Sequence, residues 1–167
     1  VFQSDTLESY VLCEFNDPLY IVFSSGTTGK PKCITHSIGG VLIQHAKEHL
    51  LHINLSEKQK MFYFTTCGWM MWNWLVGSLF CKSSIVLYEG SPFYPNPEHL
   101  WKIAEKSKVS VFGTSAKYID ALSKSNVVPK KHFTLSNLRT ICSTGSPLSP
   151  DSYDYILNNI KPDVQIS

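Results

Sequence analysis

The chain has 167 residues, of which 43% are hydrophobic and 17% charged, and its net charge is +2. This composition is ordinary for a globular domain with its own core. Lysines and arginines are scattered along the chain, so they form no basic stripe of the kind that binds nucleic acid. No uninterrupted apolar run reaches the length of about 18 residues that a membrane-spanning helix requires. We therefore expect neither a nucleic-acid partner nor a membrane span.

The ends and the cysteines of the chain indicate its setting. Residues 1–5 resemble neither a signal peptide nor a start at an initiating methionine, so we expect the sequence to begin inside a longer protein. The five cysteines include no C-x-x-C pair. This pattern favours reduced core thiols of a cytosolic protein over a disulfide framework or a zinc site.

Short apolar runs alternate with longer amphipathic stretches along the chain. The run 19–23 predicts a buried strand, which a polar loop at 24–32 follows. Helices are expected at 39–52, at 70–81 (apolar nearly all round), at 98–106, at 116–123 and from Pro150, with Ser149 as its N-cap. Further strands are expected at 61–65, 84–88, 109–112, 138–142 and 164–166. This alternation predicts an α/β fold with a mostly parallel sheet and helices on both faces.

The loop S-S-G-T-T-G-K-P-K, residues 24–32, is dense in groups that bind phosphate. Gly26 and Gly29 have no Cβ, so backbone N–H groups there can approach phosphate oxygens closely. Hydroxyl donors and positive charges are added by Ser24, Ser25, Thr27, Thr28, Lys30 and Lys32. It is not a Walker A loop, because Pro31 stands where that motif has a hydroxyl that binds magnesium. The pattern favours phosphate binding over an ordinary polar turn.

This loop resembles the signature of the adenylate-forming superfamily, which contains acyl-CoA synthetases, luciferases and peptide-synthetase adenylation domains. The segments at 33–52, G-W-M-M-W-N-W at 68–74 and S-T-G-S-P-L at 143–148 resemble the acetoacetyl-CoA synthetases in particular. The resemblance covers nearly the whole chain, whereas the chain covers a minor part of such an enzyme. It implies that residues 1–167 are a fragment of the large N-terminal AMP-binding domain, with the C-terminal domain absent.

The resemblance implies a cytosolic ligase. It would activate acetoacetate with Mg²⁺ and ATP to an acyl-adenylate, and would then transfer the acyl group to CoA. Acetyl-CoA synthetase or another short-chain acyl-CoA synthetase is the alternative. Lys30 would be the catalytic residue, and the loop from Ser24 to Lys32 would hold the β- and γ-phosphates as pyrophosphate leaves. Later motifs of the family are missing from the sequence, so we expect this chain alone not to catalyse.

The same resemblance assigns a nucleotide contact near the end of the chain. Gly145, Ser146 and Pro147 stand where related enzymes carry G-E-P against the adenine of ATP. Ser146 replaces the glutamate and so removes a charge. A strand-to-helix turn with a capping serine is the other interpretation, and both can hold because sheet-end turns are where α/β proteins bind ligands.

Candidate acyl-pocket residues follow Gly68. The family element is G-W-x-x-G, and this chain departs from it because Trp72 replaces the second glycine. Trp69, Met70 and Met71 are candidates to line the pocket, and the hydroxyl of Thr144 is a candidate to meet the 3-oxo group of acetoacetate. An aromatic core patch is the alternative, and we favour it for Trp72 and Trp74.

A rival interpretation comes from residues 45–49, H-A-K-E-H, which match the H-x-x-E-H motif of a class of zinc peptidases. On a helix, His45 and His49 would share one face, as a zinc site requires. The sequence singles out no further carboxylate ligand, and a solvated helix face is the simpler explanation. Because the run also belongs to the synthetase resemblance, we assign no metal ligand.

Overall fold

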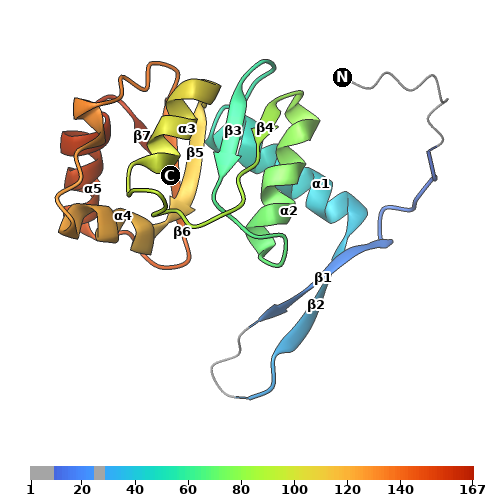
Figure 1. Cartoon of the computed structure of the whole chain (residues 1–167). Coiled ribbons are helices and arrows are strands. Elements are labelled where there is room, and N and C mark those ends of the chain that lie inside the picture. The colour runs from blue at the N-terminus through green and yellow to red at the C-terminus, as the bar shows by residue number, and fades with distance from the viewer. Residues whose placement is uncertain (1–9, 25–28) are drawn as a thin grey trace. The chain divides into compact units, whose positions relative to one another are not determined.

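The computed structural model describes residues 10–24 and 29–167, which belong to two compact units, residues 1–44 and residues 45–167. No helix in the described part of the chain is long and apolar enough to cross a membrane. Figure 1 labels the helices and strands that are used below.

The N-terminal unit is a β-hairpin followed by the start of a helix. Strand β1 (Pro18–Ser24) pairs antiparallel with β2 (Lys32–Ser37), and Ser24 lies opposite Lys32 where the loop between them begins and ends. Helix α1 (Ile38–Ala46) follows directly, and its first N–H group donates to the carbonyl of Asp17 at 2.9 Å. The loop predicted from sequence is therefore the connection of a two-stranded hairpin.

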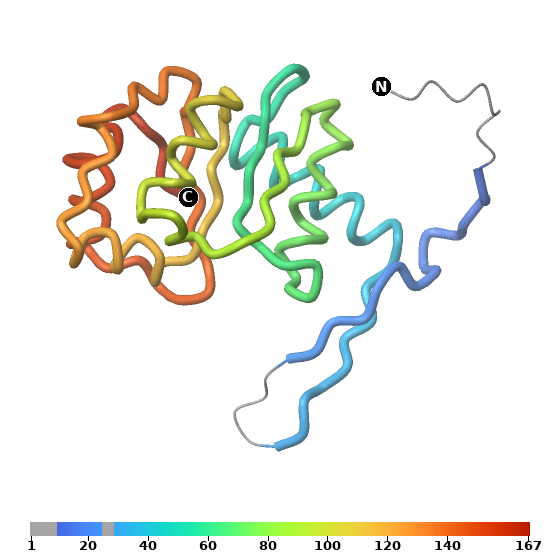
Figure 2. The backbone as a smooth tube through the Cα atoms, in the orientation of Figure 1, coloured from blue at the N-terminus to red at the C-terminus, as the bar shows by residue number. Residues whose placement is uncertain are grey.

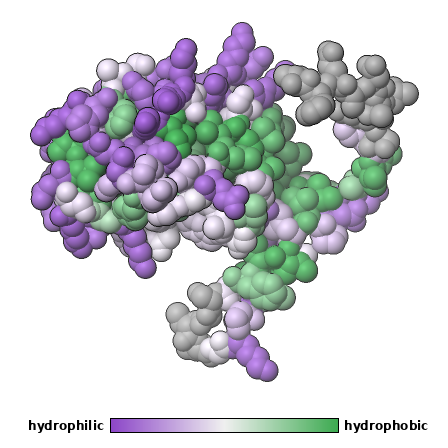
Figure 3. Space-filling view, viewed as in Figure 1, coloured by the Kyte–Doolittle hydropathy of each residue, from purple (hydrophilic) through white to green (hydrophobic). Residues whose placement is uncertain are grey.

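The prediction that residues 19–23 form a buried strand is half wrong. The strand exists, but Ile21 is 55% exposed and Phe23 is 67% exposed. Figure 3 shows hydrophobic residues at the surface of this hairpin. The physical reason is that the described residues of the N-terminal unit add no third strand and no covering layer to the pair, so they bury neither face of the hairpin.

The C-terminal unit is built on a five-stranded sheet in the order β4-β3-β5-β6-β7, in which every neighbouring pair is parallel. Figure 2 traces these strands side by side. The strands are β3 (Lys60–Tyr63), β4 (Ser84–Val86), β5 (Val111–Ser115), β6 (Thr140–Thr144) and β7 (Gln165–Ile166). The connecting helices are α2 (Met70–Gly77), α3 (His99–Ser107), α4 (Ala116–Lys124) and α5 (Pro150–Tyr155). Short single turns are η1 (Lys47–His52), η2 (Ser78–Cys81), η3 (Pro129–Lys131) and η4 (Ile156–Ile160).

Consecutive residues of the central strands enter two different cores. Met61 and Tyr63 pack on one side with Met71 and Leu75 of α2, whereas Phe62 between them packs on the other side. There Phe62 stacks on Phe112 at 5.0 Å between ring centroids. The second core also receives residues of α3, α4, α5 and η4. This two-faced burial is what a parallel sheet requires, and it confirms the predicted α/β architecture with helices on both faces.

Two helices begin at serine caps, of which the one at Ser149 was predicted from the sequence and the one at Ser115 was not. Ser149 is the N-cap of α5, and its hydroxyl accepts the backbone N–H of Ser152 at 3.2 Å. Ser115, the last residue of β5, caps α4 in the same way through the N–H of Tyr118. A short hydroxyl side chain at these positions satisfies an N–H group that the helix itself leaves unpaired.

Two other expectations need correction. The helix predicted over 70–81 ends at Gly77 and continues as the 3₁₀ turn η2, and Phe80 is 53% exposed because α2 covers only one face of the sheet. The cysteines are all free, but only Cys81 and Cys142 are buried core thiols, while the other three are exposed (Cys13, Cys33 and Cys67). Apolar neighbours in sequence therefore did not ensure burial at these positions.

Gly113 of β5 lies opposite Tyr63 of β3, and a Cβ at this glycine would overlap the Tyr63 ring. We predict that Gly113→Ala lowers the free energy of unfolding by about 1–3 kcal/mol, the usual cost of overpacking a core. Urea denaturation of both proteins measures the difference. Gly68→Ala is the matched control, because nothing lies within 4 Å of the added methyl group. Equal stability of the two variants would contradict the packing described here.

Candidate functional site

The loops that follow the parallel strands gather at the carboxyl edge of the sheet. Residues 64–69 follow β3, residues 87–90 follow β4, Ser115 ends β5, and Gly145–Pro147 follow β6. In open α/β sheets, ligands bind outside the carboxyl ends of the strands. This edge is therefore the candidate site of the C-terminal unit.

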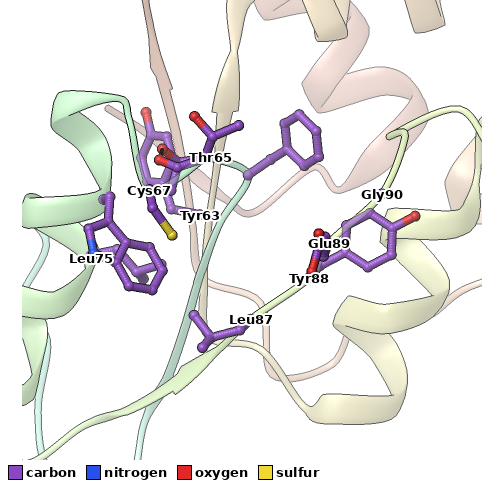
Figure 4. Close-up of a pocket in the computed structure, with 11 residues that line it drawn as sticks. Tyr63, Thr65, Cys67, Leu75, Leu87, Tyr88, Glu89 and Gly90 are labelled. Carbon is purple, nitrogen blue, oxygen red and sulfur yellow. Dashed lines mark hydrogen bonds between the residues drawn. The ribbon is translucent and has the colours of Figure 1, made fainter.

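A cavity of about 510 Å³ opens at this edge beyond β3 and β4. Its walls come from the two strand ends and from helix α2, and they are formed by Tyr63, Phe64, Thr65, Thr66, Cys67, Trp72, Leu75, Leu87, Tyr88, Glu89 and Gly90. Figure 4 shows Tyr63, Thr65 and Cys67 on one side and Tyr88 and Glu89 on the other. The cavity has the size and the mostly apolar lining with a few polar groups that small-molecule sites share.

Three of the predicted acid-binding residues, Trp69, Met70 and Met71, stand at the start of helix α2 and do not line this cavity. Trp69 is the N-cap residue of α2 and is 36% exposed, and Met70 is 45% exposed. Met71 is 8% exposed and packs in the core with Leu75. Trp72 and Trp74, for which we favoured an aromatic core patch, are half-buried and pack against this core, and Trp72 also forms part of the cavity wall. The sequence thus predicted helix α2 correctly, but it did not predict which of its side chains line the cavity.

Thr144 and the G-S-P segment lie elsewhere on the same edge. Thr144 ends β6 and is in register with Ser115 of β5, so β5 separates it from β3 in the sheet. Gly145 has a φ of +92°, a left-handed conformation that glycine adopts without strain. Ser146 and Pro147 line a small depression of about 180 Å³ with Lys117 and Asp120 of α4. The G-S-P segment therefore borders a different hollow from the 510 Å³ cavity, and Thr144 lines neither of them.

The phosphate loop belongs to the other unit. Of its residues, Ser24 ends β1, Gly29 and Lys30 form a bend, and Lys32 begins β2. The side chains of Lys30 and Lys32 are exposed. Ser25, Gly26, Thr27 and Thr28 lie outside the described residues. The described part therefore presents two lysines at one end of a hairpin, which is an open arrangement for a polyanion.

The zinc interpretation of residues 45–49 is not supported by the geometry. His49 is fully buried, and its Nε2 lies 2.9 Å from the backbone carbonyl of Trp74, to which it donates. His45 is also buried, so the alternative of a solvated helix face is wrong for the two histidines, although Lys47 of the same run is exposed. Among the described residues, no group of three or more His, Cys, Asp or Glu side chains is placed to hold a metal ion. Both histidines are parts of the core packing.

Burial lowers the pKa of His49 from 6.5 to about 4, although its hydrogen bond to the Trp74 carbonyl acts in the opposite direction. The neutral ring is favoured because charging it would leave an ion in an apolar setting. Burial likewise raises the pKa of the Cys142 thiol to about 12. Neither group therefore supplies a charge to the candidate site at neutral pH.

The lowered pKa of His49 predicts acid sensitivity. Between pH 6.5 and 4 the unfolded chain binds a proton at this position and the folded chain does not, so the free energy of unfolding decreases as the pH is lowered through this window. The slope contributed is at most about 1.4 kcal/mol per pH unit. Denaturation of wild type and His49→Gln at several pH values tests this, because the variant lacks the titrating ring. His52→Gln, at an exposed position of the same turn, keeps the wild-type slope. The prediction is wrong if wild type and His49→Gln share one slope.

A parallel sheet covered on both faces, with cavities at its carboxyl edge, is an α/β architecture of the kind that binds ligands outside the carboxyl ends of its strands. Residues 4–163 match the family described as AMP-binding enzyme. The chain therefore belongs to the AMP-binding enzyme family.

Several relatives that match over most of this chain are named acetoacetyl-CoA synthetase. The chain is 54% identical over 153 residues to acetoacetyl-coenzyme A synthetase of Rhizobium meliloti (strain 1021), a match that covers 92% of this chain and 24% of that protein. It is 50% identical over 150 residues to acetoacetyl-CoA synthetase of Gallus gallus, covering 90% of this chain and 22% of that protein. The chain thus spans about a quarter of the length of these relatives.

Solved structures give the same fold. Acetoacetyl-CoA synthetase from Streptomyces lividans superposes with a TM-score of 0.90 at 40% identity, covering 98% of this chain and 26% of that one. The luciferase-like enzyme of the mealworm Zophobas morio superposes with a TM-score of 0.71 at 24% identity, covering 92% of this chain and 34% of that one. The second likeness concerns the fold alone.

Proposed function

We propose that this chain is part of an acid–thiol ligase that activates acetoacetate with Mg-ATP and transfers the acyl group to CoA. The observation that carries the proposal is the 54% identity to an acetoacetyl-coenzyme A synthetase over 92% of the chain. The lysine-bearing hairpin loop and the cavity at the sheet edge supply the chemistry that such an enzyme needs. The cytosol is its proposed location.

The reaction has two steps. A carboxylate oxygen of acetoacetate attacks the α-phosphorus of ATP, the bond to the oxygen that bridges the α- and β-phosphates breaks, and pyrophosphate leaves. The thiol sulfur of CoA then attacks the acyl carbon, and the C–O bond to AMP breaks. The thiol proton passes to solvent, and acetoacetyl-CoA and AMP are released. Positioning and charge neutralisation dominate such transfers.

Lys30 is the proposed catalytic residue, because its ammonium group neutralises charge that develops on the departing pyrophosphate. Its exposed position at the end of the hairpin leaves the side chain accessible to a polyphosphate. Ser24, Gly29 and Lys32 are proposed to bind the same β- and γ-phosphates. The remaining loop residues, Ser25, Gly26, Thr27 and Thr28, are proposed to contribute backbone and hydroxyl donors.

The carboxyl edge is the proposed place for the other substrates. Gly145, Ser146 and Pro147 are proposed to lie against the adenine, since their turn presents backbone in a left-handed conformation at Gly145. Trp69, Met70 and Met71 are proposed to define the acid side through helix α2, which forms part of the 510 Å³ cavity wall. Thr144 is proposed to donate to the 3-oxo oxygen of acetoacetate. The burial of Met71 favours Trp69 and Met70 over Met71 as direct contacts.

Removing the charge of Lys30 tests the phosphate role. In an active enzyme that contains this chain, Lys30→Ala should slow acetoacetate-dependent ATP–pyrophosphate exchange by about 10²–10³-fold, the usual effect of losing one electrostatic contact to the transition state. Lys130→Ala is the control, because Lys130 is an exposed lysine of η3. An unchanged exchange rate in Lys30→Ala would remove this lysine from the mechanism.

Thr144→Val tests whether the acid is read by its oxo group. Valine keeps the volume and removes the donor, so kcat/KM for acetoacetate should fall about tenfold relative to butyrate, which has no oxo group to satisfy. Adenylation rates with the two acids measure the ratio, and butyrate is the internal control. Equal losses with both acids would show that this hydroxyl does not contact the oxo group.

A further inference from the structure

The two histidines at 45 and 49 pack against helix α2, which supplies Trp72 and Leu75 to the wall of the 510 Å³ cavity. Gly77 in the last turn of α2 has His45 so close that an added Cβ would overlap the imidazole. His49 lies on the π-helical turn η1, and its ring centroid is 4.4 Å from that of Trp74. The helix is thus held from this side by two buried rings.

The carbonyl of Trp74, which accepts the hydrogen bond from His49, does not accept the helical hydrogen bond from Ser78. In a continuous α-helix the N–H of Ser78 would bond to the carbonyl of Trp74, four residues earlier. Here the N–H of Ser78 bonds to the carbonyl of Leu75 instead, because α2 tightens into the 3₁₀ turn η2. His49 Nε2 donates to the Trp74 carbonyl at 2.9 Å. The histidine therefore satisfies a carbonyl group that the change of helix type leaves open.

The packing continues from His49 to the start of α2. The Trp74 ring meets Tyr63 edge to face at 5.8 Å between centroids, and Tyr63 meets Trp69 edge to face at 6.3 Å. The Tyr63 hydroxyl donates to the Thr114 carbonyl at 3.3 Å, which ties this row of rings to strand β5. Tyr63 is also part of the cavity wall (Figure 4). A row of rings thus joins the buried histidine to the residue that begins α2.

We infer that His49 is a positioning residue for acid selection: it fixes helix α2, which carries Trp72 and Leu75 of the cavity wall, and through Trp74 it supports Tyr63, which also lines the cavity and contacts the indole of Trp69. The inference rests on the proposed function. A pocket can discriminate between acids that differ by one small group only if the side chains that line it are held in fixed positions. Helix α2 supplies part of that lining.

The test compares three variants in an active enzyme that contains this chain. His49→Leu fills the space without a donor, and should lower the acetoacetate-to-butyrate ratio of kcat/KM about tenfold, mainly through KM for the acid. His49→Gln keeps an N–H donor within reach of the carbonyl, and should restore the ratio to within about threefold of wild type. His52→Leu, at an exposed position of the same turn, should change nothing. KM for ATP should stay within about twofold in all of them.

Loss of stability alone would give a different result. If His49→Leu lowers activity with both acids and raises KM for ATP without changing the acid ratio, or if His49→Gln is no better than His49→Leu, the inference is overturned. If His49→Leu does not fold, His49→Asn replaces it, because the shorter side chain leaves its donor out of reach of the Trp74 carbonyl. A wild-type enzyme that forms no acetoacetyl-adenylate overturns the proposed function and this inference together, whereas active wild type with unresponsive His49 variants overturns the inference alone.

Discussion

Parallel pairing of β3, β5 and β6 imposes the constraint on which the C-terminal unit depends. A parallel sheet must bury both of its faces, so consecutive residues such as Met61 and Phe62 enter separate cores. Each core then needs its own covering elements, which are α2 on one side and α3, α4 and α5 on the other. The helices therefore cover both faces of the sheet, because both faces carry apolar side chains that must be buried.

The same constraint creates the candidate site. Strands that run in one direction end at one edge, so the loops after β3, β4, β5 and β6 come together there although they are far apart in sequence. The cavity behind Tyr63 and the hollow beside Ser146 are both products of this convergence. The hairpin loop is different, because antiparallel pairing of β1 with β2 holds its two ends side by side without help from the sheet.

The two histidines illustrate how burial changes the meaning of a motif. In sequence, H-A-K-E-H suggests a metal site or a solvated helix face. In the fold, His49 gives its Nε2–H to the Trp74 carbonyl and stays neutral, while His45 packs on Gly77. A buried imidazole that donates to a backbone carbonyl stabilises the fold. It can affect substrate binding only by holding helix α2 in place.

The sequence by itself determined the class of fold, the alternation of strands and helices along the chain, the cap at Ser149, and the loop of glycines, hydroxyls and lysines, because these follow from local pattern and residue chemistry. It also carried the family resemblance. Only the tertiary structure decided that Ile21 and Phe23 are exposed, that Trp72 lines a cavity while Met71 is in the core, and that Thr144 ends β6 whereas Trp69 begins α2 beyond β3. The physical reason is that burial and the facing of a helix depend on which partners cover an element, and those partners come from distant parts of the chain.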